Sequence, residues 1–420
     1  MKKRLLHILA LVAIAALVLS ACGTPAAAPT ATSAPAPTKA PEPTKAPEAT
    51  KAPEATAAPT EAVTDWAHAT SAEEGGGMDA LIAAAQTEGQ LTTIALPHDW
   101  CNYGEVIDAF KAKYGLTVNE LDPNAGSNDE LEAIKANKDN PGPQAPDVVD
   151  VGVAFGPTAK DEGVITPYMV ATWDTIAGLK DEDGYWYSDY GGVLVFQVNK
   201  DLVDPLPEDW ADLLKPEYKG LVALAGDPRA SNQAAQTVMA AALANGGTLD
   251  DVGPGLDYFR EMAQAGNLLP LISNSGTFAK GESPITFQWD YLGKAAADTL
   301  AGNPEVAIVY PKAGILGGFY VQAVSAYAPH PAAARLWEEF LYSDEGQQIW
   351  MNGYCVPARF ADMAARGVIP QELLDKMPAP EVMGVAIFPT VDQLSAMRER
   401  VKNEWDTVVN FALATATPAP

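Results

Sequence analysis

Aromatic and acidic side chains occur together at places in the sequence where apolar segments end. Trp289, Asp290 and Tyr291 follow the apolar segment 284–287. Aromatic faces with nearby carboxylates suit an organic cation, because each well-placed contact between a cation and a ring contributes about 0.5–2 kcal/mol. The candidate residues for such a box are Asp99, Trp100, Tyr103, Asp150, Tyr190, Trp289, Asp290, Tyr291 and Tyr320. Each ring also suits ordinary core packing, and each aspartate a capped loop or a solvated surface.

A second group of polar residues favours a ligand of the opposite charge. Ser231, Asn232 and Gln233 begin a predicted helix shortly after Arg229. Free backbone N–H groups at a helix N-terminus attract anions. We therefore include Arg229, Ser231 and Asn232 among the candidate ligand-binding residues, although helix capping alone explains Ser231 or Asn232 equally well.

The residue patterns that usually carry catalysis or hold a metal are missing from the sequence. It contains no GxSxG, Walker or GxGxxG motif, and no CxxC or HExxH motif. Asp181 and Asp183 resemble the start of a calcium loop, but the later ligand positions do not follow. His98 and Asp99 are adjacent, so their side chains would point apart on a strand. We therefore expect a binding protein without catalytic residues, cofactor or bound metal.

Helix and strand patterns that would position these residues alternate from Met78 onwards. Strands are expected at about 91–96, 118–121, 148–151, 221–225, 284–287, 306–310 and 319–326. Helices are expected at about 79–85, 106–114, 127–138, 231–245, 254–262, 291–300, 332–342 and 394–413. This alternation predicts mostly parallel sheets that helices cover on both faces, in two α/β lobes. Ligands of such folds bind beyond the carboxyl ends of strands, or in a cleft between lobes.

The N-terminal segment has the pattern of an export signal. Lys2, Lys3 and Arg4 precede the apolar run 5–19. The sequence from Leu19 to Cys22 resembles the lipobox of bacterial lipoproteins, in which the cysteine is lipidated. We predict a lipoprotein signal peptide at 1–21 and lipidation of Cys22. An ordinary signal peptide cleaved near Ala21 is the alternative, and it also implies export.

A segment rich in proline, alanine and threonine follows the predicted lipid anchor. It contains three copies of Thr-Lys-Ala-Pro-Glu, at 38–42, 44–48 and 50–54. Such a sequence has little apolar surface to bury, so we predict a disordered tether over 22–75. The tail 414–420 has a similar composition, and we expect it to be disordered as well.

The charge of the chain excludes one large class of partners. The formal net charge is −27 at pH 7. An acidic surface repels phosphate backbones and cannot release their counterions, which drive non-specific binding to DNA or RNA. Nucleic acid is therefore not an expected partner.

Three stretches resemble the periplasmic solute-binding proteins of ABC importers, in the group that contains spermidine/putrescine, thiamine, ferric-iron and phosphonate binders. The first runs from Asn199 through the segment 210–214 to Gly220. The second is 226–229, which leads into a helix, and the third runs from 310–312 through 343–346 to Tyr354. The resemblance covers roughly residues 88–410.

This resemblance implies a type II-like periplasmic-binding-protein fold with an interlobe cleft and a hinge. Lobe 1 would comprise 76–195 and 310–413, and lobe 2 would be an insertion at 196–309. The implied function is capture of a small solute by hinge closure, followed by delivery to a membrane permease. The receptor would be a monomer, exported and lipid-anchored to the outer face of the cytoplasmic membrane.

Departures from the family patterns leave the solute open. Polyamine binders carry a Trp and an Asp after the Pro-Lys turn, where this chain has Tyr320 and Gln322. Ferric-iron binders carry adjacent tyrosines, whereas Tyr190 precedes Gly191. We include Gln322 among the ligand-binding candidates and favour an organic cation, such as thiamine or a polyamine. A phosphonate or other anion and chelated iron are the alternatives.

The arrangement of lobes in this family also implies where the two remaining cysteines lie. It would place both Cys101 and Cys355 in lobe 1, and an exported chain permits their pairing. We predict a disulfide between them, with two buried free thiols as the alternative.

Two other classes of function compete with a receptor. A tethered hydrolase or transferase would need a nucleophile, a base and an orienting group in the cleft. A surface adhesion or scaffold protein would have no deep cleft between lobes and no ligand-dependent stability.

Overall fold

The structure is a computed structural model that describes residues 65–413. The predicted signal peptide, the lipidation site Cys22 and the tail 414–420 lie outside the described residues. The described residues belong to one compact unit. No helix among them is both long and apolar enough to span a membrane.

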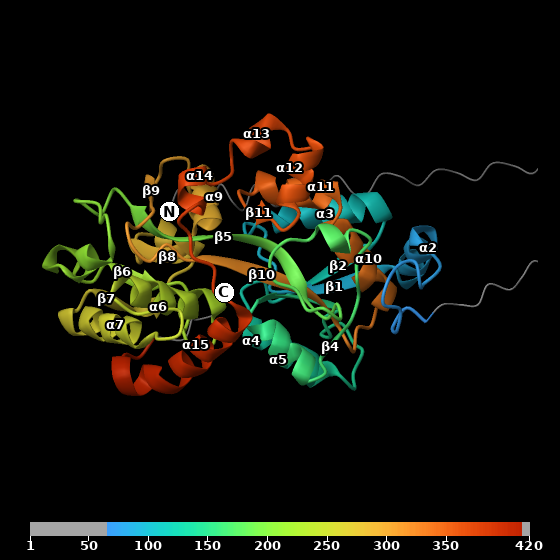
Figure 1. Ribbon diagram of the computed structural model, residues 1–420, viewed down its shortest axis with the longest axis horizontal. Coiled ribbons are helices and arrows are strands. Elements are labelled where there is room, and N and C mark those ends of the chain that lie inside the picture. Colours follow the sequence, from blue (N-terminus) through green and yellow to red (C-terminus); the bar gives the residue numbers. More distant parts are fainter. Residues whose placement is uncertain (1–64, 414–420) are drawn as a thin grey trace, which may run out of the picture. The chain divides into compact units, whose positions relative to one another are not determined.

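One long strand, β5 (Tyr187–Asn199), connects two groups of elements, and every residue in it is buried. Its first half pairs with β10 (Gly317–Ser325), and its second half pairs with β8 (Ile285–Trp289) and β9 (Val306–Val309). Figure 1 shows β5 running between these groups. Gly191 permits close packing at the midpoint, because a Cβ atom there would lie 2.6 Å from the carbonyl oxygen of Gly318.

The first group begins with α2 (Met78–Glu88) and β1 (Gln90–Ile94). Its other elements before β5 are α3 (Tyr103–Tyr114), β2 (Thr117–Leu121), α4 (Ser127–Asn137), β3 (Val148–Gly152), α5 (Phe155–Asp161), β4 (Ile165–Thr166) and η1 (Trp173–Thr175). The expected alternation of helices and strands is therefore present here. Strand β10 lies between β3 and β5, antiparallel to both.

The second group follows β5 along the chain. It contains η2 (Trp210–Leu214), η3 (Pro216–Tyr218), β6 (Val222–Leu224), α6 (Asn232–Ala244), α7 (Gly253–Ala265), β7 (Leu268–Ile272), α8 (Ser275–Ala279), β8, α9 (Asp290–Leu300) and β9. Helix α6 begins close to the expected position, because the Ser231 side chain accepts a hydrogen bond from the backbone N–H of Ala234 as its N-cap.

The expected α/β class is confirmed, and the sheet is mixed. The pairs β1–β2, β6–β7 and β6–β8 are parallel, as expected. Strand β5 is antiparallel to β8, β9, β10 and β11 (Val356–Pro357). The chain passes from one group to the other along β5 and returns along β10, so these adjacent strands run in opposite directions.

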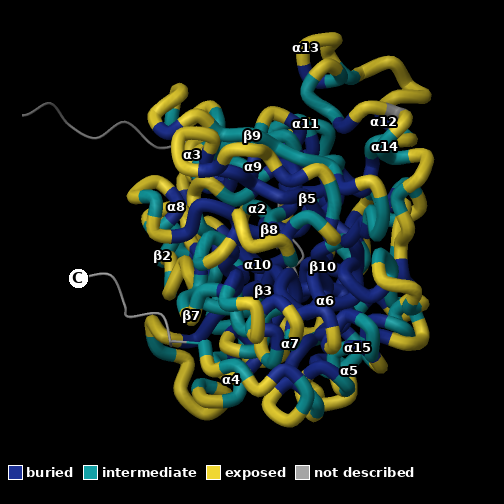
Figure 2. Tube along the Cα trace, turned by 90° about the vertical axis from the view of Figure 1, so that its left-hand side faces the viewer, coloured by how far each residue is buried: buried dark blue, intermediate teal, exposed yellow. Residues whose placement is uncertain are grey.

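The return segment ends in a series of helices. These are α10 (Pro331–Leu341), α11 (Asp344–Asn352), α12 (Phe360–Arg366), α13 (Gln371–Leu374), α14 (Pro380–Met383), α15 (Val391–Glu404) and the π-helix η4 (Trp405–Val409). The helix expected at 394–413 thus changes form at Trp405. Buried segments run through β3, β5, β10, α6 and α10 (Figure 2).

Residues 65–75, which composition assigned to the tether, are packed onto the first group. Trp66 is 7% exposed, and a Cβ atom on Gly75 would clash with its ring. Arg335 on α10 donates hydrogen bonds to the carbonyl oxygens of Ala67 and Ala69, at 3.1 and 2.8 Å. Unlike the repeats, this segment has a tryptophan with apolar surface to bury. The packed part of the chain therefore begins before residue 76.

Candidate functional site

Six predicted aromatic residues gather where the two groups of elements meet. Trp100 lies between β1 and α3, Tyr103 begins α3, Tyr190 and Tyr320 lie on β5 and β10, and Trp289 and Tyr291 lie at the β8–α9 junction. The Trp100 ring lies 6.0 Å from that of Tyr291 and 5.5 Å from that of Tyr320. The rings of Tyr190 and Tyr320 stack at 5.8 Å. With Asp150, Asp189 and Gln322, these residues form what we call the aromatic–acid cluster.

Asp150 lies at the centre of this cluster. Its Oδ2 atom accepts hydrogen bonds from the hydroxyl groups of Tyr103 and Tyr190, at 2.8 and 2.6 Å. Tyr190 in turn accepts a hydrogen bond from Nε1 of Trp100 at 2.7 Å. Burial raises the pKa of Asp150 to about 7, although the tyrosine hydrogen bonds oppose that rise. The other oxygen, Oδ1, is buried without a hydrogen-bond partner among the described residues.

A second buried acid, Asp189, was not among the predicted site residues. Gln322 donates from Nε2 to Oδ2 of Asp189 and to the hydroxyl of Tyr103, both at 2.9 Å. Burial raises the pKa of Asp189 well above its usual value, and the neighbouring charge of Asp150 raises it further. The sequence carried a signal for this residue, because Asp189 is the one acid in the buried strand β5.

The two acids of the cluster have no cationic side chain as a partner among the described residues. Asp150 is 6% exposed and Asp189 is fully buried. Within residues 65–413, none of the ion pairs includes either carboxyl group. Buried charges are normally paired, so this arrangement favours either a bound proton or a bound cation.

Asp290 points away from the cluster, although its neighbours Trp289 and Tyr291 belong to it. Its Oδ1 atom accepts a hydrogen bond from the backbone N–H of Val193 at 3.0 Å. Its Oδ2 atom accepts one from the Tyr310 hydroxyl at 3.1 Å and lies 3.4 Å from Nζ of Lys294. The carboxylate of Asp290 therefore accepts hydrogen bonds from β5 and Tyr310, outside the cluster.

Three further candidates have their partners outside the cluster. Asp99 is exposed and accepts a hydrogen bond from Ser275 of α8 at 3.0 Å. Arg229 forms ion pairs with Asp227 and Asp406. Ser231 caps α6. Ser231 therefore stabilises the start of α6, whereas Asp99 joins the first group of elements to the second.

Asn232 lies at the boundary between the two groups of elements. A Cβ atom on Gly152, at the end of β3, would lie 2.1 Å from its Cγ atom. Its amide nitrogen Nδ2 is buried and has no hydrogen-bond partner among the described side chains and backbone. This close approach brings β3 of the first group against α6 of the second.

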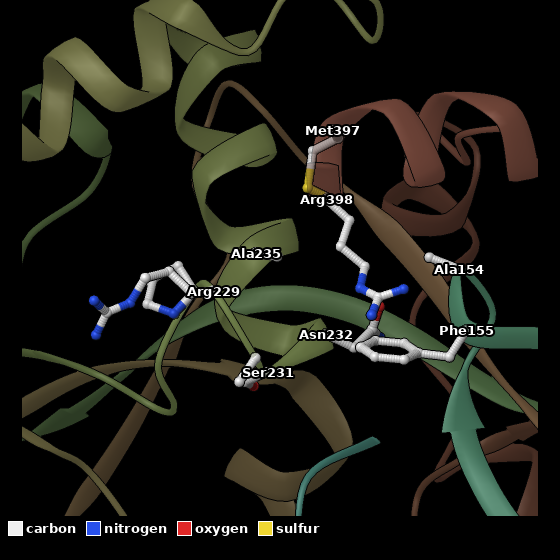
Figure 3. A pocket seen from close by; sticks show the side chains of 10 residues that line it. Ala154, Phe155, Arg229, Ser231, Asn232, Ala235, Met397 and Arg398 are labelled. Carbon is white, nitrogen blue, oxygen red and sulfur yellow. The ribbon is translucent and has the colours of Figure 1, made fainter. Parts of the chain in front are cut away.

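An arginine that sequence reasoning missed lies beside Asn232. The Arg398 side chain extends from α15 over the ring of Phe155, with its Cζ atom 3.5 Å from the ring centroid. Figure 3 shows this guanidinium near Asn232, whereas Arg229 points away from it. Burial lowers the pKa of Arg398, and its Nε atom has no partner in the described part of the chain. No free space for a water molecule remains between these side chains, within the described structure.

A disulfide joins Cys101 to Cys355, with their Cα atoms 5.7 Å apart. Cys101 follows Trp100 and has a positive φ of 45°. Cys355 precedes β11, which pairs with β5 at Gly191 and Tyr190. The bond therefore holds the loop that carries Trp100 close to the strand that carries Tyr190.

A metal centre is not evident at the cluster. Within the range 65–413, no three His, Cys, Asp or Glu side chains are grouped so that they could hold a metal ion. Asp181 and Asp183, which resembled a calcium loop, instead bind the ammonium group of Lys160.

Solved structures with a similar fold are periplasmic binding proteins. AfuA from Actinobacillus pleuropneumoniae, with fructose-6-phosphate bound, is 20% identical; the alignment covers 77% of this chain and 98% of AfuA, with a TM-score of 0.60. Iron-bound HitA from Pseudomonas aeruginosa is 19% identical, with coverages of 76% and 98% and a TM-score of 0.55. A putative spermidine/putrescine ABC transporter protein from Listeria monocytogenes is 15% identical, with coverages of 76% and 99% and a TM-score of 0.54.

Sequence comparison shows the family directly. A comparison with curated protein sequences finds no match. The family described as bacterial extracellular solute-binding protein matches residues 144–378, which is more than half of the chain and includes β3, β5, β8 and β10. Together with the fold, this match confirms the expected resemblance: the chain belongs to the bacterial extracellular solute-binding proteins.

Proposed function

We propose that this protein is the receptor of an ABC importer and that it captures a small organic cation in the aromatic–acid cluster. The observation that carries the proposal is the buried pair Asp150 and Asp189, which no cationic side chain neutralises among the described residues. Aromatic rings surround this pair, and their faces attract cations. Thiamine and the polyamines are therefore the first solutes to test.

Binding requires the two groups of elements to separate and close again. The contacts that must separate include Gly152 with Asn232 and Asp99 with Ser275. Trp100, which is partly exposed, lies on the first group, whereas Trp289 and Tyr291 lie on the second. A cation held between them would favour closure by its better contacts in the closed state. The closed receptor, a monomer, would then deliver the solute to the permease subunits.

Calorimetric titration of the full-length protein with thiamine, spermidine and putrescine tests the cation site. We expect one of them to bind, and Asp189→Asn to weaken its binding at least tenfold, because the variant removes one carboxyl group of the acid pair. Glu217→Gln is the matched control, because Glu217 is an exposed acid far along the chain from the cluster. Equal affinity in wild type and Asp189→Asn would remove the acid pair from the site.

An anionic solute is the second candidate, and a specific observation favours it. Arg398 and the Nδ2 atom of Asn232 both have unused donors beside the first turn of α6. Such donors suit a phosphonate or carboxylate. Titration with 2-aminoethylphosphonate, in wild type and Arg398→Met, tests this alternative. If Arg398→Met weakens the binding of the phosphonate and Asp189→Asn does not, the anion replaces the cation as the proposed solute. Ferric citrate is the probe for the third alternative, chelated iron.

The leader supports a lipid anchor as the means of localisation. The basic residues 2–4, the apolar run 5–19 and Cys22 have the order found in lipoprotein signal sequences. We propose that lipidated Cys22 holds the receptor on the outer face of the cytoplasmic membrane. Cys22→Ala should abolish labelling by radioactive palmitate, and persistent labelling would place the modification elsewhere.

A further inference from the structure

A cavity of about 420 Å³ lies outside the aromatic–acid cluster. One side comes from α9 and the segment after β9, which supply Lys294 and Tyr310. The other side comes from the chain after α11, which supplies Tyr354, Lys376, Met377 and Val382. This volume is in the range of small-molecule sites. We call it the two-lysine cavity.

Two lysines, Lys294 and Lys376, line this cavity. The ammonium group of Lys376 donates to the backbone oxygen and Oδ1 of Asn352, at 2.9 and 2.6 Å, and lies 4.9 Å from the Tyr354 ring centroid. These are neutral partners, and no ion pair of Lys376 occurs among residues 65–413. Lys294 donates to the backbone oxygen of Lys376 at 3.4 Å, so both cations face the same space.

Two carboxylates lie beside the lysines. Asp290 lies 3.4 Å from Lys294, but it also accepts hydrogen bonds from Val193 and Tyr310. Asp375 lines the cavity, is exposed, and accepts a hydrogen bond from Gln371 at 2.8 Å. Of the two lysines, Lys376 is the one without an ion pair among the described residues, and the exposed Asp375 adds one negative charge to the same lining.

Apolar groups form the remaining wall. Met377, Pro378, Ala379 and Val382 line the cavity together with the two lysines. The Tyr354 ring lies between the two lysines, within 5.8 Å of one and 4.9 Å of the other. Its hydroxyl donates to Asp298 of α9 at 2.5 Å, which fixes the ring across the boundary between the two groups of elements. Tyr354 also has a φ of 70°, a strained conformation for a side chain of this size.

We propose that the two-lysine cavity is a second binding site, for a small organic anion with an apolar body. The anionic group would contact Lys376 and Lys294, and the apolar body would lie between Met377, Val382 and the ring of Tyr354. Because the cavity is lined from both groups of elements, an occupant would contact both. This site is separate from the solute site proposed above and does not depend on it.

Calorimetric titration of the full-length protein with naphthalene-2-sulfonate tests the proposal. We expect saturable binding to one site, weakened at least tenfold in Lys376→Met and by a smaller factor in Lys294→Met. Lys280→Met is the matched control, because Lys280 is exposed and outside the cavity. Methionine keeps a long unbranched side chain and removes the charge.

Two comparisons make the test specific. Naphthalen-2-ol, which lacks the full charge, and inorganic sulfate, which lacks the apolar body, should each bind at least tenfold more weakly than the sulfonate. Val382→Asp offers a second variant, which should abolish sulfonate binding while near-UV circular dichroism confirms the native fold. Absence of sulfonate binding, or equal binding by wild type and both lysine variants, would overturn the proposal. Equal affinity for sulfate would overturn the role of the apolar wall.

Discussion

The aromatic–acid cluster and the two-lysine cavity differ in both charge and openness. The cluster contains two buried acids and tightly packed rings, whereas the cavity has about 420 Å³ of free space and an unneutralised lysine. Both lie where the two groups of elements meet. A solute could therefore enter the cluster only after the two groups of elements separate, because side chains fill that space, whereas the cavity is already open. The disulfide connects the two regions, since Cys101 follows Trp100 and Cys355 follows Tyr354.

Removing the disulfide should have the largest effect on stability. The two cysteines are 254 residues apart, and opening so long a loop lowers the unfolding free energy by about 5 kcal/mol on the chain-entropy model. The double variant Cys101→Ser, Cys355→Ser should therefore unfold at much lower urea concentration and bind the cluster's solute more weakly. A midpoint equal to that of the wild type, with m unchanged, would show that the bond does not constrain the chain.

Truncating one side chain in each region should lower the unfolding free energy much more in the packed cluster than in the open cavity. Trp289→Ala removes a fully buried ring and should cost about 3–5 kcal/mol. Val382→Ala removes part of a half-buried cavity wall and should cost about 0.5 kcal/mol. Urea unfolding of both variants measures the contrast. Similar losses in the two variants would contradict the difference in packing.

The acid pair should make stability depend on pH. Burial raises the pKa of Asp150 from 3.8 to about 7, so the folded protein binds a proton that the unfolded chain has released. By linkage, this contribution to stability is greatest below pH 4 and falls as the pH rises towards about 7. The stability of wild type minus that of Asp150→Asn, measured by urea unfolding from pH 4 to 8, should therefore decrease with pH. A constant difference would show that Asp150 titrates normally.

The smallest effect is expected for the cavity's free cation. Lys376 is half-buried and donates only to the oxygens of Asn352. Lys376→Met should therefore change the unfolding free energy by no more than about 0.5 kcal/mol. Thermal unfolding measures this, with Lys280→Met beside it. A loss several times larger would identify Lys376 as a structural residue and undermine its use as a free ligand group.

The local pattern of apolar and capping residues predicted the positions of most helices and strands, but not how distant strands pair. The helix expected at 231–245 is α6, at Asn232–Ala244, because its N-cap serine lies in the sequence itself. The mostly parallel sheet was expected from alternating helices and strands, but the direction of β5 against β10 depends on strands more than a hundred residues apart. Residues 65–75 show the same limit, because their packing depends on distant residues such as Arg335 of α10.

The amino-acid sequence alone shows rings and acids after strands, and motifs that resemble one family of solute-binding proteins. Which of these side chains come into contact depends on the fold. Asp290 follows Trp289 yet faces β5, whereas Asp189 enters the cluster from the middle of that strand. Arg398 and Lys376 reach their sites from C-terminal segments without a local signal. The reason is that side-chain direction follows from strand register and helix packing, which non-local contacts set.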